Sequence, residues 1–314
     1  MLNDKDLPKT LQQAVKYFSD DLVCVNLVAS LRWTDGVAIC PQCRNNQTSF
    51  LSTRKIWKCK ACKKQFSVKV GTIFEDSPIG LDKWLMAMWL IVNAKNGISS
   101  YEIHRAIGIT QKSAWFMLHR IRLAMENGSI EKLSGEVEAD ETFIGGLAKN
   151  MHKHKREAKI KGRGSVGKTA VMGILERKGK VSAKVIGDLT KETMHKEVKS
   201  IVEKGSTLFT DEWKSYQGLS EDYIHEVVNH GIAEYVRGNV HTNGIENFWT
   251  LLKRTIKGTY VSVEPFHLGR YVVEQAFRFN ERELNDKERF LGVLKAISGK
   301  RLTYDELRGY QTSV

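Results

Sequence analysis

The amino-acid sequence predicts a multidomain protein, in which a small metal-binding ribbon and an all-α region precede a larger α/β domain with a mixed five-stranded sheet. Three observations lead to this prediction. Two Cys-x2-Cys pairs lie near the start of the chain, helical patterns with glycine and serine signals follow them, and strand-like and helix-like segments alternate from about residue 135. With 314 residues, the chain is long enough for several domains.

The composition favours a globular protein with a polyanionic partner. Hydrophobic residues make up 41% of the chain, only four residues are proline, and the formal net charge is +13. Such a positive surplus favours nucleic acid as the partner. No apolar run is long enough to cross a bilayer, and the start MLNDKDLPKT lacks the pattern of a signal peptide. We therefore expect a cytoplasmic protein with reduced thiols and no membrane partner.

Changes in charge, glycine content and hydrophobic period divide the chain into five segments. They are an N-terminal helical segment (1–35), a zinc ribbon (36–75), a helix-turn-helix region (80–128), an α/β catalytic domain (133–285) with a basic loop (148–168), and a C-terminal helical tail (286–314).

Four cysteines near the start have the spacing of a structural zinc site. Cys40 and Cys43 form one pair, and Cys59 and Cys62 form the other. Each pair can grip one side of a tetrahedral ion, and cysteine at all four positions leaves none for water, so we expect one structural Zn²⁺. A redox dithiol is the alternative, but no βαβ pattern surrounds either pair. The fifth cysteine, Cys24, lies in an apolar run and is interpreted as a packed helix residue, with a fifth ligand as the alternative.

The predicted ribbon is also basic. The chain has no acidic residue from Arg54 until Glu75. A solvated hairpin with a small aromatic core would show this pattern, but the overall charge favours contact with DNA phosphates. The predicted contacts in the ribbon are Lys58, Lys60, Lys63 and Lys64.

Residues 80–128 predict three helices arranged as a helix-turn-helix. The first pattern ends at Gly97, a serine at position 99 or 100 can cap the second, and Gly108 makes the turn before the third, which Thr110 can cap. The third helix, QKSAWFMLHRIRLAM, is basic, and in this plan it enters the major groove. Lys112 and Arg120 are the predicted DNA contacts here, and an ordinary helical bundle is the alternative.

From about residue 135, the pattern predicts a mixed α/β sheet covered by helices. The order is three strands, a helix, two strands and a helix that contains HTNGIENFWTLLKR. Asp140 lies on the first strand, Asp211 at the end of the fourth, and Glu246 on the last helix. This order of acidic residues suits the RNase H-like arrangement.

Three such carboxylates suit chemistry at a phosphodiester. In-line displacement at phosphorus is served by two divalent ions about 4 Å apart, which activate the attacking oxygen and stabilise the leaving one. Mg²⁺ takes hard oxygen ligands, and Mn²⁺ can replace it. We therefore expect two such ions at Asp140, Asp211 and Glu246, although each acid alone would also suit a strand edge, a turn or a helix cap. Glu138 and Glu141 are the nearest rivals to Asp140, since Glu138 lies on the same strand face.

The helix that carries Glu246 has two interpretations. Its apolar residues form one stripe, and Lys253 and Lys257 lie on the same flank as Glu246. In one interpretation Asn243 is the N-cap and Glu246 completes a capping box. In the other, Glu246 is a catalytic carboxylate and the two lysines contact the DNA backbone. His241 and Asn243 are further candidates, either as supports of the carboxylate or as substrate contacts.

The basic tract between the first two strands also has two interpretations. It is either a solvated insert or a loop that becomes ordered on nucleic acid. Its predicted DNA contacts are Lys153, Lys155 and Arg156.

Six motifs together give the chain a family resemblance. It resembles the bacterial insertion-sequence transposases that join an N-terminal zinc ribbon to a DDE-type, RNase H-like (integrase-like) catalytic domain. The motifs lie between about residues 20 and 280 and are LRWTDGVAICPQC, WKCKACKKQFSVKVGTIFEDSPIGLDKW, KSAWFMLHRIRLAM, VEADETFIGG, LFTDEWKSYQGL and HTNGIENFWTLLKR. Asp140, Asp211 and Glu246 match the DDE triad, and the cysteines of the two pairs match the ribbon ligands.

The resemblance implies a DNA transposase that binds the terminal inverted repeats of an insertion sequence and carries out metal-dependent cleavage and strand transfer. It implies that Asp140 bridges both ions, while Asp211 holds one and Glu246 the other. It also implies double-stranded DNA as the partner, a homodimer or larger assembly on DNA, and a place at the bacterial nucleoid. An inactive, domesticated transposase that acts as a DNA-binding regulator is one alternative, and a plain RNase H-like nuclease is another.

Overall fold

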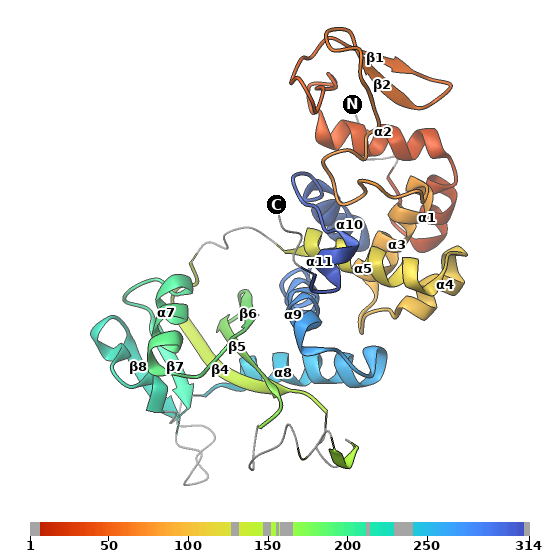
Figure 1. Cartoon of the computed structure of the whole chain (residues 1–314). Helices are drawn as coiled ribbons and strands as arrows, with labels where there is room; N and C mark the ends of the chain where they lie inside the picture. The colour runs from red at the N-terminus through yellow and green to blue at the C-terminus, as the bar shows by residue number, and fades with distance from the viewer. Residues whose placement is uncertain are drawn as a thin grey trace. The chain divides into compact units, whose positions relative to one another are not determined.

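The structure, a computed structural model, describes residues 7–126, 132–146, 152–154, 157, 166–211, 214–228 and 241–310. The chain forms two compact units (Figure 1). Unit 1 comprises the residues up to Glu126 and those from Arg282 onward, whereas unit 2 is the continuous stretch between them. Among the described helices, none is both long and apolar enough to cross a membrane.

A three-stranded antiparallel sheet forms the ribbon of unit 1. Its strands, in spatial order, are β1 (Thr48–Leu51), β2 (Ile56–Cys59) and β3 (Gln65–Phe66). The ring of Trp57 lies edge-on to that of Trp33, with centroids 4.9 Å apart, and is stacked against Phe66 at 6.4 Å. These aromatic contacts support a sheet that is too small for a core of its own.

The remainder of unit 1 is helical. Its described helices are α1 (Leu11–Phe18), α2 (Asp21–Arg32), α3 (Leu81–Asn93), α4 (Ser100–Ile107), α5 (Gln111–Met125), α10 (Asp286–Lys295) and α11 (Tyr304–Leu307). Phe290 of α10 packs against Phe18 of α1 and Trp89 of α3, with ring centroids 5.4 Å apart in both pairs. The segment after residue 282 therefore completes the core that the N-terminal helices begin.

α4 and α5 are joined by the turn that the sequence predicts. Ser99 caps α4, Gly108 ends it in the left-handed conformation with φ of 63°, and Thr110 caps α5. However, α5 lies deep within unit 1, because α3, α4, α10 and α11 all pack against it. Its residues from Met117 to Ile121 are buried, whereas Lys112 in the first turn is exposed.

A mixed sheet forms the centre of unit 2, and the predicted fold class is confirmed. Its strands are β4 (Glu136–Ile144), β5 (Thr169–Glu176), β6 (Val181–Val185), β7 (Thr207–Asp211) and β8 (Ile224–Val228), in the spatial order β6-β5-β4-β7-β8. β5 pairs antiparallel with both β4 and β6, whereas β7 runs parallel to β4, and β8 runs parallel to β7. Three antiparallel strands followed by two parallel ones are the RNase H-like arrangement.

Helices cover both faces of this sheet (Figure 1). α7 (Lys191–Ile201) lies on one face, against β5 residues such as Met172 and Ile174. α8 (Asn243–Thr255) and α9 (Pro265–Asn280) lie on the other, and the π-helical turn η6 (Ile256–Tyr260) follows α8. Because side chains alternate along a strand, successive β4 residues face α7 and α8 in turn.

Candidate active site and zinc centre

The four ribbon cysteines converge on one point. The Sγ atoms of Cys40 and Cys62 lie 3.6 Å apart, as do those of Cys43 and Cys59, and all four lie within 4.8 Å of one another. A tetrahedral zinc ion with Zn–S bonds of about 2.3 Å needs sulfur atoms about 3.8 Å apart. The cluster therefore fits a structural zinc ion, as the spacing of the cysteines predicts.

Backbone N–H groups favour the thiolate form in this cluster. The N–H of Cys43 lowers the pKa of Cys40 to about 7, and the N–H of Cys62 lowers the pKa of Cys59. Thiolates are the form that binds zinc. Cys24 is not part of the cluster, because its buried thiol donates to the carbonyl of Phe18 at 3.3 Å and burial raises its pKa to about 12. It is a packed helix residue, as expected.

Asp140 and Asp211 approach each other because β4 and β7 run parallel. Glu138 lies opposite Phe209, so the same register continued by two residues brings Asp140 level with Asp211, the last residue of β7. The charges of Asp211 and Glu246 both act on Asp140. The three carboxylates are spaced more widely than the cysteines, which are the only group of three or more potential metal ligands so close together in the described part of the chain.

Asp140 is half-buried and receives a hydrogen bond from α8. The indole Nε1–H of Trp249 donates to its Oδ2 at 2.9 Å. The pKa of Asp140 is raised to about 6, chiefly by burial and further by the charges of Asp211 and Glu246, whereas the bond from Trp249 opposes the shift. A bound cation would relieve the repulsion among these like charges and the cost of burying Asp140, so the donor set fits hard divalent ions.

Glu246 lies in the first turn of α8 with its side chain exposed, and the interpretation as a capping box with Asn243 as N-cap is wrong. The N-cap is Thr242 rather than Asn243, and its side chain makes no cap hydrogen bond but donates to Oε1 of Glu246 at 3.2 Å. A capping box at Asn243 would need the N–H of Glu246, but this N–H donates to the carbonyl of Thr242. Glu138 of β4 accepts the N–H of Ile245 in place of an N-cap side chain. Asn243 is the first residue of the helix and is exposed.

Both carboxylate oxygens of Glu138 are engaged in holding α8. Oε2 accepts the Ile245 N–H at 2.9 Å, and Oε1 accepts the Nε–H of Arg177 at 2.9 Å. Arg177 also donates to the backbone carbonyl of His241 at 2.8 Å. Glu138 is 1% exposed, so these contacts satisfy a buried charge. Glu138, Arg177 and His241 together fix the start of α8.

Two glycines let α8 approach the sheet closely. Gly173 lies opposite Asp140 in β5, and a Cβ atom there would lie 2.6 Å from the ring of Trp249. A Cβ atom on Gly244 would lie 2.8 Å from Oε2 of Glu138. Both hydrogen bonds between β4 and α8 therefore depend on the absence of a side chain at a neighbouring position.

Glu141 lies on the other face of β4, on the side of α7. Burial raises its pKa to about 8, and the charges of Asp140 and Asp211 raise it further. Tyr216 is 1% exposed, and burial raises its pKa well above its usual value. Glu141 is therefore mainly a neutral acid at pH 7 and faces away from α8.

Replacing Glu141 with glutamine should stabilise the protein in Mg²⁺-free buffer, and more so as the pH rises. The folded-state pKa of Glu141 is raised from 4.5 to about 8. Between these values the folded state binds more protons than the unfolded state, so the wild type loses stability as the pH rises. Urea unfolding should show no difference near pH 4.5 and an advantage for Glu141→Gln of about 3 to 5 kcal/mol above pH 8. Parallel pH profiles would contradict the burial of a titrating acid.

The structure shows which of the predicted DNA contacts are exposed and which are buried. Those that are exposed are Lys58, Lys60, Lys63, Lys64, Lys112, Lys153, Lys253 and Lys257. Lys155 and Arg156 lie outside the described residues. The predicted DNA contact at Arg120 is wrong, because this residue is only 4% exposed. Its guanidinium donates to the backbone carbonyls of Ile73, Glu75 and Leu302 at 2.6 to 3.0 Å. Since α5 lies in the core of unit 1, this arginine joins chain segments inside the unit and cannot reach DNA.

Sequence reasoning missed two side chains next to the carboxylates. The apolar stripe assigns Trp249 to packing alone. A buried indole N–H needs an acceptor, and this requirement could have predicted a polar partner for Trp249. Arg177 occupies a turn that looks solvent-exposed in the sequence. In the structure its guanidinium carbon lies 3.9 Å from the centroid of the Phe209 ring, beside Glu138.

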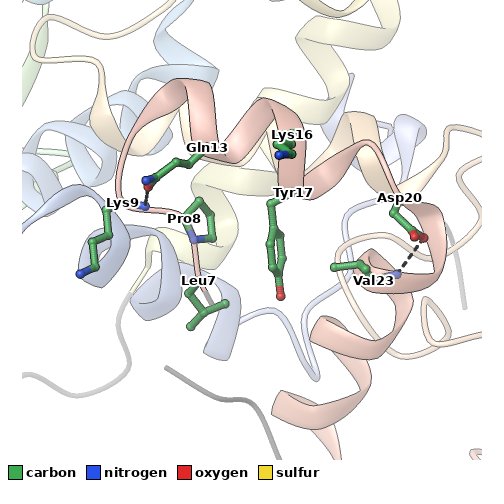
Figure 2. A pocket seen from close by; sticks show the side chains of 8 residues that line it. All are labelled: Leu7, Pro8, Lys9, Gln13, Lys16, Tyr17, Asp20 and Val23. Carbon is green, nitrogen blue, oxygen red and sulfur yellow. Dashed lines mark hydrogen bonds between the residues drawn. The ribbon is translucent and has the colours of Figure 1, made fainter. Parts of the chain in front are cut away.

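A hollow of about 500 Å³ lies against α1 in unit 1 (Figure 2). It is lined by Leu7, Pro8, Lys9, Gln13, Lys16, Tyr17, Asp20 and Val23. Two of its polar side chains serve the local helices, because Gln13 accepts the Lys9 N–H at 2.8 Å and Asp20 accepts the Val23 N–H at 3.2 Å. We assign no function to this hollow.

Comparison with known proteins finds a domain match around each of these two sites. Residues 132–280 match the model of the ISXO2-like transposase domain, and residues 19–65 match that of the transposase zinc-ribbon domain. The chain is also 27% identical over 254 residues to a protein of Halobacterium salinarum described as an uncharacterized protein in transposable element ISH50. That alignment covers 76% of this chain and 84% of the relative. Because the two matched domains together span more than half of the chain, it belongs to the family of transposases that combine a zinc ribbon with an ISXO2-like transposase domain.

Proposed function

We propose that this transposase binds the terminal inverted repeats of its element, cleaves DNA there with Mg²⁺ or Mn²⁺, and transfers the strand to target DNA. The observation that carries the proposal is the approach of Asp140, Asp211 and Glu246 from β4, β7 and α8. Family membership supports the reaction class, and the carboxylates indicate where in unit 2 it takes place.

In this proposal the three carboxylates hold two divalent ions. Asp140 interacts with both other acids and would be the central ligand, and Asp211 and Glu246 would complete the set of ligands. When bound, the ions would activate the attacking oxygen and stabilise the leaving one. The contribution of the chain is to fix the carboxylates: Trp249 holds Asp140, and Glu138 holds the start of α8. We give Glu138 no ligand role, because both of its oxygens are already bonded.

The reaction needs no nucleophilic side chain. Water first attacks a phosphodiester, the bond between phosphorus and the 3′ oxygen breaks, and a 3′-OH is released. This 3′-OH then attacks a phosphodiester of the target, where one P–O bond forms and another breaks. The number of phosphodiester bonds is unchanged in the second step, so no external energy source is required.

The exposed lysines and the demands of transposition suggest how the DNA is held. Lys253 and Lys257 follow Glu246 along α8 and η6, and the ribbon lysines offer a second set of phosphate contacts. Two element ends must be held together, which favours a homodimer or a larger assembly on DNA. We place this activity at the nucleoid of the bacterial cytoplasm.

Replacing Asp211 with asparagine should abolish nicking and joining, because the amide removes one anionic metal ligand. The substrate is a plasmid that carries the inverted repeats flanking the gene, incubated with Mg²⁺. The loss should be at least about 10³-fold, with DNA binding near that of the wild type. Glu192→Gln, on the exposed side of α7, is the matched control and should keep full activity.

Three outcomes separate the proposal from its rivals. Continued cutting by Asp211→Asn would refute the assigned carboxylates. Specific binding by the wild type without any cleavage in Mg²⁺ or Mn²⁺ would favour a DNA-binding regulator. Cutting without strand joining would favour a plain nuclease.

A further inference from the structure

A basic hollow of about 450 Å³ lies beyond the carboxylates on the α8 side of the sheet. Its walls are the end of β4, Lys168 before β5, and the chain from Lys253 to Val263. β4 and α8 both lead from the proposed active site to this hollow. Ile144 follows Asp140 by four residues, or about 13 Å along β4, and Lys253 follows Glu246 by seven residues, or about 10 Å along α8.

The lining combines three positive charges with apolar surface. Lys168, Lys253 and Lys257 line the hollow, and no acidic residue is among the lining residues. None of these lysines forms a salt bridge with any residue that the structure describes. Ile144 and Ile256 contribute the apolar part. A ligand that complements such a site carries negative charge at one end and a flat or apolar body at the other.

The wall opposite β4 is held in a fixed shape. The hydroxyl of Tyr260, in η6, donates to the buried carboxylate of Glu274 on α9. Val261 follows with φ of 63°, a conformation that costs a β-branched residue about 1–3 kcal/mol, and its side chain is 77% exposed. π-Helical turns and strained residues are frequent at functional sites. The hollow is therefore formed before any ligand arrives.

We propose that this hollow binds one unpaired nucleotide of the DNA strand that is cut, with the phosphate on the lysines and the base on the apolar wall. The inference rests on the proposed function, because the distance from the carboxylates corresponds to about three stacked nucleotides. A volume of about 450 Å³ lies in the range of sites that enclose a small ligand. It cannot admit a duplex, whose major groove alone is about 12 Å wide. Only a nucleotide that has left the base stack can enter, as in enzymes that act on flipped bases.

Binding to paired and unpaired DNA tests the proposal without cleavage. The full-length protein is titrated in Mg²⁺-free buffer with a short blunt duplex of arbitrary sequence, and with the same duplex extended by unpaired nucleotides at the 3′ or the 5′ end. At least one extended duplex should bind about tenfold more tightly, since base contacts outside the duplex add about 1–3 kcal/mol. 2-Aminopurine in the extension should change its fluorescence on binding.

Two pairs of variants locate the effect. Ser262→Trp fills the hollow from its exposed rim and should remove the preference for the extended duplex, whereas Ser200→Trp, on exposed α7, should keep it. Lys253→Gln should weaken the preference and lower the salt dependence of extended-duplex binding by about one ion, whereas Lys196→Gln on α7 should not. Unchanged thermal unfolding checks that each variant is folded.

The outcomes are distinct from those of the cleavage assay. Equal binding of blunt and extended duplexes by the wild type would overturn the proposal. So would a Ser262→Trp protein that loses affinity for both duplexes alike, because the hollow would then only contact the backbone. If the protein cleaves DNA but binds blunt and extended duplexes equally, only the proposed nucleotide site in the hollow is refuted. If it prefers the extended duplex but does not cleave, only the proposed catalysis is refuted.

Discussion

Replacing Cys40 with serine should release the zinc ion and unfold the ribbon while unit 2 stays folded. The four Sγ atoms tie the turn before β1 to the end of β2 and to the turn after it, and the sheet itself consists of three short strands. Binding of a structural zinc contributes about 10–16 kcal/mol at pH 7 to domains of this kind, which is more than such a sheet gains otherwise. Zinc content should fall from one ion per chain to none, and the near-UV signal of the packed pair Trp33 and Trp57 should disappear.

Cys24→Ala is the matched control for this experiment. It also removes a buried thiol, but one that lies outside the cluster and donates to the Phe18 carbonyl. This variant should lose some stability and keep one zinc ion. A Cys40→Ser protein that retains stoichiometric zinc would show that three thiolates suffice. Loss of zinc from Cys24→Ala would show that the fifth cysteine has been misplaced.

Replacing Trp249 with phenylalanine should lower the cleavage rate about 10- to 100-fold, the usual effect of removing a partner that orients a metal ligand. An aromatic ring remains, but it fills less of the buried space than the indole and has no N–H to hold Oδ2 of Asp140. The Mg²⁺ concentration needed for half-maximal rate should therefore rise, in addition to a loss of thermal stability from the smaller ring. Trp249 is in this sense a positioning residue. Trp84→Phe in unit 1, which loses an indole bond to Ser77, should leave the Mg²⁺ requirement unchanged.

Gly173→Ala should produce the same defect by displacing the ring. Its Cβ atom would lie 2.6 Å from Trp249, and overpacking of this kind costs about 1–3 kcal/mol. The combination of Gly173→Ala with Trp249→Phe should be no worse in Mg²⁺ requirement than either variant alone, because both remove one hydrogen bond. Additive defects, or a normal Mg²⁺ requirement in Trp249→Phe, would contradict the positioning role.

Much of the fold follows from local signals in the sequence. The cysteine spacing predicts the cluster, and Ser99, Gly108 and Thr110 act as the caps and turn that their positions indicate. The alternation along β4 correctly separates the side of Asp140 from that of Glu141. These features succeed because each depends on residues that are close together in the sequence.

The errors arise where distant segments meet. Arg120 looks like a DNA contact on a basic helix, and only the packing of Ile73 and Leu302 around α5 reveals it as an interior residue. The start of α8 is held by Glu138, which lies more than a hundred positions away from Ile245 and accepts the Ile245 N–H in place of an N-cap side chain. Local patterns give the chemistry of a side chain, but its partner depends on tertiary contacts.

The assembly of unit 1 from two separate stretches has a consequence for synthesis on the ribosome. Unit 2 is continuous and can fold as soon as it emerges, whereas unit 1 must wait for α10, whose Phe290 covers Phe18 and Trp89. Until then the nascent chain exposes an apolar surface, to which chaperones can bind. Translation that stops before residue 282 should therefore yield chains that fold around the carboxylates yet lack a finished helical unit. A chain with a complete unit 1 therefore always contains the whole of unit 2.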